Sequence, residues 1–198
     1  MCEKVLDINE VARFFDGLAP TWDDHGEPDA SRLARILDAL GDVSGSHVLD
    51  IACGTGVLEP YLLGRGAGRV TGVDLSEGML RVARARGLGE KVEFLVADAA
   101  VAELPACDAC IVFNALPHFA DPGALFANVA ASLAPGGVLV VAHDASRSQV
   151  DGYHGGSATS VSLRLPPARE LADAMRAAGL TPGAAIDDEI YLVSARRP

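Results

Sequence analysis

Residues 48–56 read VLDIACGTG, an apolar segment that runs directly into a glycine-containing turn, and a stretch of helical character follows from residue 57. Glycines at such a turn let the backbone approach a ligand closely, while the helix N-terminus offers unpaired N–H donors. Asp74 lies 20 residues after Gly54, where a second apolar segment ends. A carboxylate in that place can accept hydrogen bonds from both ribose hydroxyls of a nucleoside. These features predict a nucleoside cofactor at the carboxyl ends of parallel strands.

Outward from this turn, short apolar segments alternate with segments of helical periodicity. The apolar segments, typical of strands, lie at residues 47–52, 69–73, 92–96, 109–113 and 138–142. The segments with helical spacing lie at residues 7–17, 30–40, 57–63, 77–86, 122–133 and 167–178. Residues 184–186 and 189–195 are expected to form a terminal antiparallel hairpin. This alternation predicts an α/β fold with a doubly wound, mostly parallel sheet of seven strands.

The length of 198 residues fits one domain. We expect residues 1–43 to form a helical cover, residues 44–143 a cofactor-binding core, and residues 167–198 a helix followed by the hairpin. Residues 144–166 are polar and rich in glycine and serine. Long loops of that kind in compact domains are often lids or binding loops, so this segment is predicted to be a lid or substrate loop.

The charge balance restricts the classes of partner. The chain has 16 Lys and Arg against 27 Asp and Glu, a formal net charge of −11. We therefore expect neither a nucleic-acid partner nor an anionic membrane partner, since both are bound largely by clustered cations. No apolar run approaches the roughly 18 residues that span a bilayer, and no secretory signal is visible, so we expect a cytoplasmic protein with reduced cysteines. A monomer or a homodimer fits these data equally.

The residues around the glycine turn distinguish between cofactors. The dinucleotide fingerprint has a third glycine where this chain has Glu59. Asp50 would repel a pyrophosphate but would attract an ammonium or sulfonium group. The pattern therefore favours S-adenosylmethionine, with S-adenosylhomocysteine as the product. An NAD-dependent oxidoreductase is the alternative, because the glycines and Asp74 suit either cofactor.

Several motifs resemble those of the class I S-adenosylmethionine-dependent methyltransferases, and the likeness covers nearly the whole chain. The resemblance is to the small-molecule branch of this family, which is akin to the quinone methyltransferases. This resemblance implies the Rossmann-like fold of those enzymes. The motifs lie at residues 14–23, 48–56, 70–80, 97–99 and 133–139, with Ala52 where glycine is more usual.

The resemblance implies a cofactor-binding role for each matching residue. Asp50 and the backbone of Gly54 and Gly56 would hold the methionine end, and Asp74 would hold the ribose. The adenine would be flanked or recognised by Leu75, Met79, Asp98 and Ala99. Two further residues complete the predicted cofactor site, Ala52 in the glycine turn and Asn114 after the fourth strand.

The acceptor site is expected beyond the fourth and fifth strands. His118, His143 and His154 are the candidates for a catalytic base, because a neutral imidazole can accept a proton near pH 7. Candidate substrate-binding residues are Trp22, His25, Arg147 and Tyr153. These assignments predict transfer of a methyl group to an oxygen, nitrogen or sulfur atom of a small molecule.

Three questions stay open at the level of sequence. A metal-dependent methyltransferase is a weaker alternative, which would require the histidines to converge. A non-catalytic module that binds S-adenosylmethionine also fits the motifs. Cys107 and Cys110 form a C-x-x-C motif without a second pair, so they are predicted to be buried apolar residues rather than metal ligands, with Cys107 at the solvent-side entry of its strand.

Overall fold

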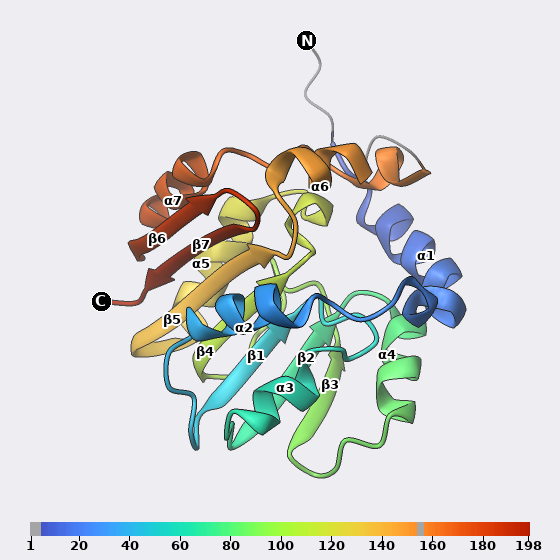
Figure 1. Ribbon diagram of the computed structural model, residues 1–198, viewed down its shortest axis with the longest axis horizontal. Coiled ribbons are helices and arrows are strands. Elements are labelled where there is room, and N and C mark those ends of the chain that lie inside the picture. Colours follow the sequence, from blue (N-terminus) through green and yellow to red (C-terminus); the bar gives the residue numbers. More distant parts are fainter. Residues whose placement is uncertain (1–4, 154–156) are drawn as a thin grey trace.

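The computed structural model describes residues 5–153 and 157–198, apart from the side chains of His25 and Ser157. Its central feature is a seven-stranded sheet with the order β3-β2-β1-β4-β5-β7-β6 (Figure 1). The strands are β1 (His47–Ile51), β2 (Arg69–Asp74), β3 (Val92–Val96), β4 (Cys107–Phe113), β5 (Leu133–His143), β6 (Thr181–Asp187) and β7 (Tyr191–Arg196). Strands β1 to β5 pair in parallel, and β7 is antiparallel to both β5 and β6. The predicted fold class and the terminal hairpin are confirmed.

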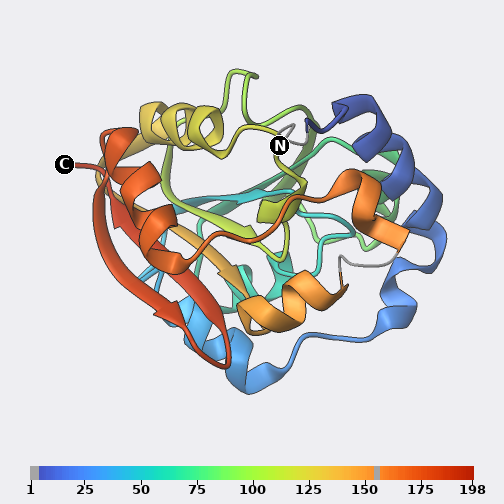
Figure 2. The same cartoon turned by 90° about the horizontal axis from the view of Figure 1, so that it is seen from above.

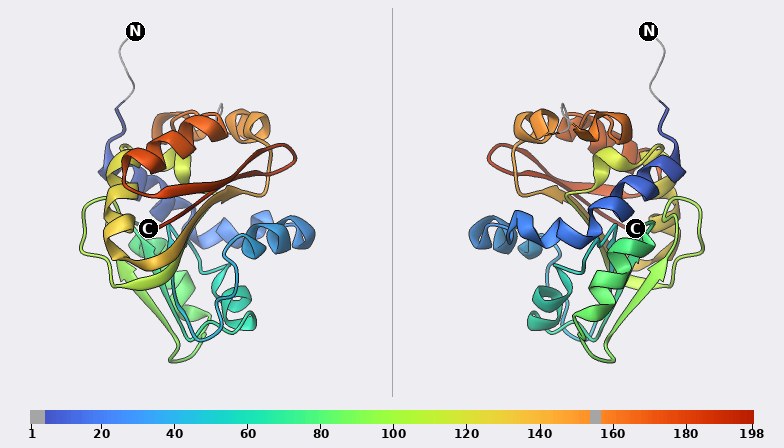
Figure 3. Two further views of the ribbon diagram at one scale, coloured as in Figure 1. Left: turned by 90° about the vertical axis from the view of Figure 1, so that its left-hand side faces the viewer. Right: turned by 90° about the vertical axis from the view of Figure 1, so that its right-hand side faces the viewer.

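The helices cover both faces of this sheet. They are α1 (Ile8–Leu18), η1 (Ala19–His25), α2 (Ala30–Asp38), α3 (Glu59–Gly64), α4 (Glu77–Ala85), η2 (Leu116–His118), α5 (Pro122–Ser132), α6 (Arg147–Tyr153), η3 (Ser157–Val161) and α7 (Ala168–Ala177). Helices α5 and α7 pack on one face, and α2 and α3 on the opposite face (Figure 3).

Alternation along the strands divides the apolar side chains between the two layers. Leu49 and Ile51 of β1 belong to the core beneath α5 and α7, whereas Val48 packs with α2 and α3. Successive strand side chains point to opposite faces, so a strand covered on both sides needs apolar residues at nearly every position. Asp50 is therefore an exception within a buried apolar strand, 1% exposed.

Short polar side chains fix the starts of the helices. The Asp29 carboxylate accepts hydrogen bonds from the backbone N–H groups of Ser31 and Arg32 at 3.0 and 2.9 Å and thereby caps α2. The Ser76 hydroxyl accepts from the Met79 N–H at 3.0 Å and caps α4. These caps satisfy N–H groups that have no partner within their helix.

Residues 144–166 differ from the irregular loop that was expected, because they contain α6 and η3. Ser146 and Gln149 exchange hydrogen bonds at the start of α6, the Ser146 N–H donating to Gln149 Oε1 at 3.0 Å. This is a capping box with glutamine as its second member. Val150 and Val161 are buried, and they anchor the segment to the domain. The role of this segment as a lid stays a prediction.

Two further observations concern the expectations from sequence. Cys107 and Cys110 are both buried, as predicted, and Cys107 stands at the entry of its strand, where β4 begins. The expectation that this entry faces the solvent is wrong, because Cys107 is only 3% exposed. The pairing of Cys107 with Leu133 extends β4 and β5 past the predicted starts of both strands, and the Cys107 side chain belongs to the core beneath α5 and α7. Within the part of the chain that the structure describes, no helix combines the length and apolar character needed to cross a membrane.

Candidate active site

A cavity of about 520 Å³ opens at the carboxyl ends of the parallel strands. Its floor is formed by the turns that follow β1, β2, β3 and β4, and its roof by α1 and η1. Helices α1 and α4 are in contact at one side of it, and η3 lies beside α1 (Figures 2 and 3). The site therefore lies at the edge of the sheet where the sequence places it.

The glycine turn after β1 is held in shape by Asp74 at the end of β2. One carboxylate oxygen of Asp74 accepts from the Gly54 N–H at 2.8 Å, and the other accepts from the Ser76 N–H at 2.8 Å. Burial raises the pKa of Asp74, and these hydrogen bonds lower it. Both Gly54 and Asp74 line the cavity. Asp74 thus fixes the turn as well as facing the space where a ribose would bind.

Gly56, assigned to the same turn, does not line the cavity. It has a φ of 78°, and a Cβ added there would lie 3.2 Å from Cβ of Ala83 in α4. Glycine is needed here for the left-handed backbone and for close packing of the turn on α4.

Asp50 is the buried acid of the cavity floor. Its Oδ2 atom has no hydrogen-bond partner among the described residues, and the side chain lines the cavity. Burial, and then the negative charges of Glu59 and Asp74, raise the pKa of Asp50. A buried carboxylate without a cationic partner lacks a counter-ion, and a cationic ligand group would supply one.

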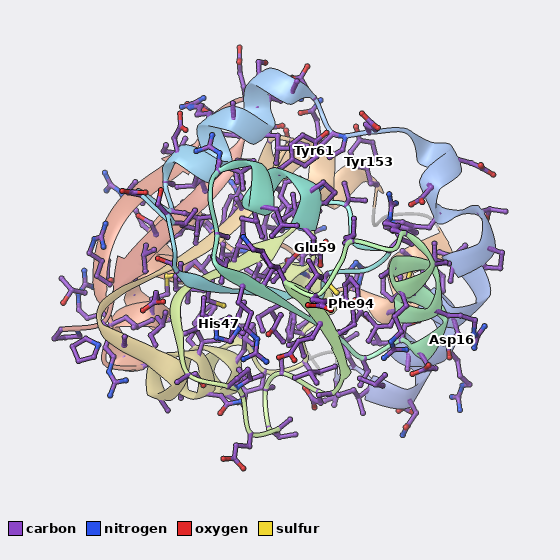
Figure 4. All side chains as sticks on the ribbon, turned by 90° about the horizontal axis from the view of Figure 1, so that it is seen from below. Asp16, His47, Glu59, Tyr61, Phe94 and Tyr153 are labelled. Carbon is purple, nitrogen blue, oxygen red and sulfur yellow. The ribbon has the colours of Figure 1, made fainter. Side chains whose placement is uncertain are left out.

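Glu59 is a buried acid whose position the sequence did not reveal. It is 0% exposed, and neither of its carboxylate oxygens has a partner in the described part of the chain. Space for it comes from Gly72, since a Cβ there would lie 2.8 Å from Glu59 Oε1 and 2.7 Å from Phe94 (Figure 4). Burial raises the pKa of Glu59 to about 7. The only signal in the sequence is an acidic residue beside the glycine turn.

The four residues assigned to the adenine all belong to the lining of this cavity. They are Leu75, Met79, Asp98 and Ala99, and Met79 is buried. Asp98 accepts from the Ala100 N–H at 2.9 Å, which orients its side chain at the end of the turn after β3. An apolar wall with one carboxylate at its rim suits a flat base with an amino group.

Two aspartates join the N-terminal cover to the cofactor-binding core. Asp16 of α1 accepts from the Ser76 hydroxyl at 2.6 Å and from the Gly78 N–H at 2.8 Å (Figure 4). These hydrogen bonds lower the pKa of Asp16. Asp23 of η1 accepts from the Thr55 hydroxyl at 2.6 Å and pairs with Arg86 at 2.6 Å. Sequence reasoning missed both contacts, because the partners are 32 to 63 residues apart.

Asn114 and Asp144 connect the ends of β4 and β5 at the cavity wall. The Asn114 amide donates to Asp144 Oδ1 at 2.9 Å, and the Asp144 N–H donates to Asn114 Oδ1 at 3.1 Å. Asn114 has a φ of 55°, a left-handed conformation that asparagine tolerates better than most residues. Asp144 was not among the candidate site residues, although it lies two positions after the predicted strand of residues 138–142.

His118 is the candidate base that lines the cavity. Its Nδ1 lies 2.9 Å from the carbonyl oxygen of Val161, and its ring centroid is 4.8 Å from that of Phe15. A carbonyl oxygen only accepts hydrogen bonds, so Nδ1 carries the hydrogen and the basic nitrogen of the neutral ring is Nε2. Trp22 also lines the cavity, with Nε1 4.0 Å from the place of a Cβ on Gly54.

The structure does not place three other predicted residues in the cavity lining. His143 is 2% exposed, and its ring centroid lies 6.0 Å from that of Tyr191. Arg147 pairs with Asp187 at 3.0 Å. Tyr153 is 69% exposed (Figure 4).

The remaining predicted positions, His154 and the side chain of His25, lie outside the described residues. Among the described residues, no group of three or more His, Cys, Asp or Glu side chains is arranged to hold a metal ion. The proposed cluster of His118, His143 and His154 therefore stays a prediction.

Known proteins resemble this chain in both sequence and fold. The ubiquinone biosynthesis O-methyltransferase of Alkalilimnicola ehrlichii is 34% identical over 143 residues, which cover 67% of this chain and 58% of the relative. That of Aeromonas salmonicida is 31% identical over 147 residues, which cover 69% of this chain and 61% of the relative. The chain thus spans about three fifths of the length of these relatives.

Solved structures share the fold at lower identity. An S-adenosylmethionine-dependent methyltransferase from Mesorhizobium loti is 23% identical with a TM-score of 0.72, covering 85% of this chain and 98% of that chain. The cyclase SpnF is 20% identical with a TM-score of 0.80, covering 99% of this chain and 98% of that chain. Residues 48–137 match the protein family described as a methyltransferase domain. Together with the sheet order and the glycine turn, these findings show that the chain belongs to the class I S-adenosylmethionine-dependent methyltransferases.

Proposed function

We propose that this protein transfers a methyl group from S-adenosylmethionine to a small-molecule acceptor. The observation that carries the proposal is the Asp50 carboxylate, which is buried on the cavity floor with one oxygen unpartnered among the described residues. S-adenosylmethionine brings an ammonium and a sulfonium group, either of which would offset that charge. A pyrophosphate, which NAD would bring, would be repelled by it.

The residues present fit the cofactor. Asp50 and the turn at Gly54 would hold the methionine end, Asp74 the ribose hydroxyls, and the wall at Met79 and Asp98 the adenine. The turn is already ordered by its hydrogen bonds to Asp74, so little backbone entropy would be lost when the ligand binds.

The chain's own contribution to the reaction would be orientation and proton removal. When bound, S-adenosylmethionine would supply a methyl group activated by its sulfonium centre, with the neutral thioether as the leaving group. The cover formed by α1 and η1 would exclude water and hold an acceptor beside that group, and such positioning gives large rate gains. Nε2 of His118 would take the proton of a hydroxyl acceptor.

The two relatives support an oxygen acceptor, since both are ubiquinone biosynthesis O-methyltransferases. A hydroxyl on a small ring compound is therefore the first acceptor to test. The cytoplasm is the proposed location, and the free cysteines Cys53, Cys107 and Cys110 fit a reducing compartment.

Calorimetric titration with S-adenosylmethionine, S-adenosylhomocysteine and NADH tests the cofactor directly. We expect micromolar binding of the two adenosyl ligands and none of NADH. Asp98→Ala should weaken binding at least about tenfold, the value of one charge-assisted hydrogen bond. Asp74→Ala should weaken it further, because the turn loses its support as well. Asp173→Ala, on the exposed side of α7, is the control and should bind normally. Binding of NADH alone would refute the proposal.

A further inference from the structure

The charges that line the cavity have one sign. Seven carboxylates contribute to its surface, those of Asp23, Glu27, Asp50, Asp74, Asp98, Asp121 and Asp144. No lysine or arginine among the described residues does so, and the other ionisable groups there are His118 and the Cys53 thiol. A cavity walled by one sign of charge concentrates ligands of the opposite sign and repels those of the same sign.

Most of these carboxylates already have a role. Three of them, Asp50, Asp74 and Asp98, belong to the cofactor site under the proposed function. Asp23 is neutralised by Arg86 at 2.6 Å, and Asp121 caps α5 by accepting from the Ala124 N–H at 2.9 Å. The two that remain are Glu27 and Asp144, and neither forms an ion pair with any described residue.

Asp144 is placed to select the acceptor. It directly follows β5 and pairs with Asn114, and that pairing uses one of its carboxylate oxygens. The nearby Arg32 donates to the backbone carbonyl of Asp144 at 2.9 Å and forms no ion pair with its carboxylate. Asp144 therefore lines the cavity without an ion pair to any described residue, and it is not among the residues assigned to the cofactor.

Aromatic rings line the same cavity. The Phe15 ring lies edge-to-face against Trp22 at 5.7 Å and against His118 at 4.8 Å, measured between centroids. All three side chains contribute to the lining. Rings beside carboxylates form the kind of surface that binds organic ammonium groups, because the ring faces carry negative electrostatic potential.

We infer that the methyl acceptor carries a protonated amine on a ring-bearing apolar frame, and that Asp144 is the residue that selects for this charge. The inference rests on the proposed function, because it divides the cavity between cofactor and acceptor. An acceptor with a carboxylate or phosphate would meet the unpaired charge of Asp144 and the remaining acids. The buried Asp50 carboxylate, assigned to the cofactor, adds to the negative lining of the same cavity.

Three probes of similar shape and different charge test the inference without requiring turnover. They are 2-phenylethylammonium, 2-phenylethanol and 3-phenylpropionate, each titrated into the full-length protein saturated with S-adenosylhomocysteine. Trp22, the only tryptophan of the chain and a residue of the cavity wall, reports binding through its fluorescence. We expect the cation to bind at least about tenfold more tightly than the anion, with the alcohol between them.

Asp144→Asn tests the named residue, since it keeps an acceptor for the Asn114 amide and removes the charge. It should reduce the cation-to-anion affinity ratio at least about fivefold while S-adenosylhomocysteine affinity stays unchanged. Asp173→Asn removes the same charge from exposed α7 and should leave the ratio as in the wild type.

The outcomes separate the two proposals. Absent binding of the cation, equal or tighter binding of the anion, or an unchanged ratio in Asp144→Asn overturns the inference. Any of these results together with normal binding of S-adenosylhomocysteine leaves the proposed function intact. Failure of the protein to bind S-adenosylhomocysteine at all would instead refute the proposed function.

Discussion

Ala52 and Asn114 are the two described residues other than glycine with positive φ, at 57° and 55°, and both line the cavity. An L-residue in this conformation costs roughly 1–2 kcal/mol, because its Cβ crowds the neighbouring carbonyl oxygen. Such strain persists where the surrounding structure holds it, often at functional sites. Here the strained positions directly follow β1 and β4, at the points where the chain leaves these two strands beside the cavity.

Replacing Ala52 by glycine should stabilise the protein. Glycine adopts the observed φ without steric cost, although it loses more entropy on folding, so we expect a net gain of about 0.5–1 kcal/mol in the free energy of unfolding. Urea unfolding measures it. The matched control, Ala174→Gly in the interior of α7, should lose about 1 kcal/mol. A loss of stability in Ala52→Gly would contradict the role of strain.

Glu59 should make stability depend on pH. Burial raises its pKa from an ordinary value of 4.5 to about 7, so the folded state holds its proton at pH values where the unfolded state has released it. This contribution is complete below about pH 4.5 and is lost as the pH rises through 7.

The Glu59→Gln variant isolates that effect. Between pH 5 and pH 8, the wild type should lose about 2–3 kcal/mol of unfolding free energy relative to Glu59→Gln, whose side chain does not titrate. Urea denaturation at several pH values gives the difference. Parallel curves for the two proteins would show that Glu59 does not carry a raised pKa.

At the scale of elements, the contact between α1 and α4 depends on Gly78. A Cβ at this position would lie 2.9 Å from Oδ1 of Asp16 and 3.0 Å from its Cα atom, so the backbone of α1 would have to move. The close approach lets the Gly78 N–H and the Ser76 hydroxyl bind one carboxylate oxygen of Asp16. This contact joins the roof of the cavity to the helix that borders the cofactor site.

Gly78→Ala should therefore weaken the cover, although alanine is the better helix former. Helix propensity alone would add about 1 kcal/mol of stability, and we expect a loss of about 1–2 kcal/mol together with weaker binding of S-adenosylhomocysteine. Urea unfolding and calorimetry measure the two effects. Gly64→Ala in α3, where no atom lies within 4 Å of the added Cβ, should be neutral or stabilising. Equal behaviour of the two variants would argue against the close contact.

At the scale of the whole molecule, the ligand is expected to bind between two parts of the fold. The cover of α1 and η1 and the sheet both line the cavity, so S-adenosylhomocysteine should stabilise the folded state as a unit. At 100 times its Kd a ligand adds about 2.7 kcal/mol, which for a chain of this size raises Tm by about 5–10 °C. A thermal scan with ligand and with NADH measures this. An equal shift with NADH would contradict the assignment of the cofactor.

Much of this architecture was predictable because it is encoded locally. The apolar segments that became β1 to β5 are contiguous, and the turn from Gly54 to Gly56 lies directly between a strand and a helical segment. The helices of residues 144–166 were missed although Ser146 and Gln149 form a capping box there. Polar composition indicated a loop, and the local caps together with the burial of Val150 outweighed it.

The sequence alone determined the class of fold, the position of the glycine turn and the sign of the charge on the cavity floor, because each depends on neighbouring residues. Only the tertiary structure decided which distant side chains meet. Asp16 and Asp23 reach the core because α1 and η1 pack over it, and Glu59 is buried because Gly72 leaves room. His143 and Asp144 differ for the same reason: adjacent residues at a strand end point to opposite sides, so one packs on Tyr191 and the other lines the cavity.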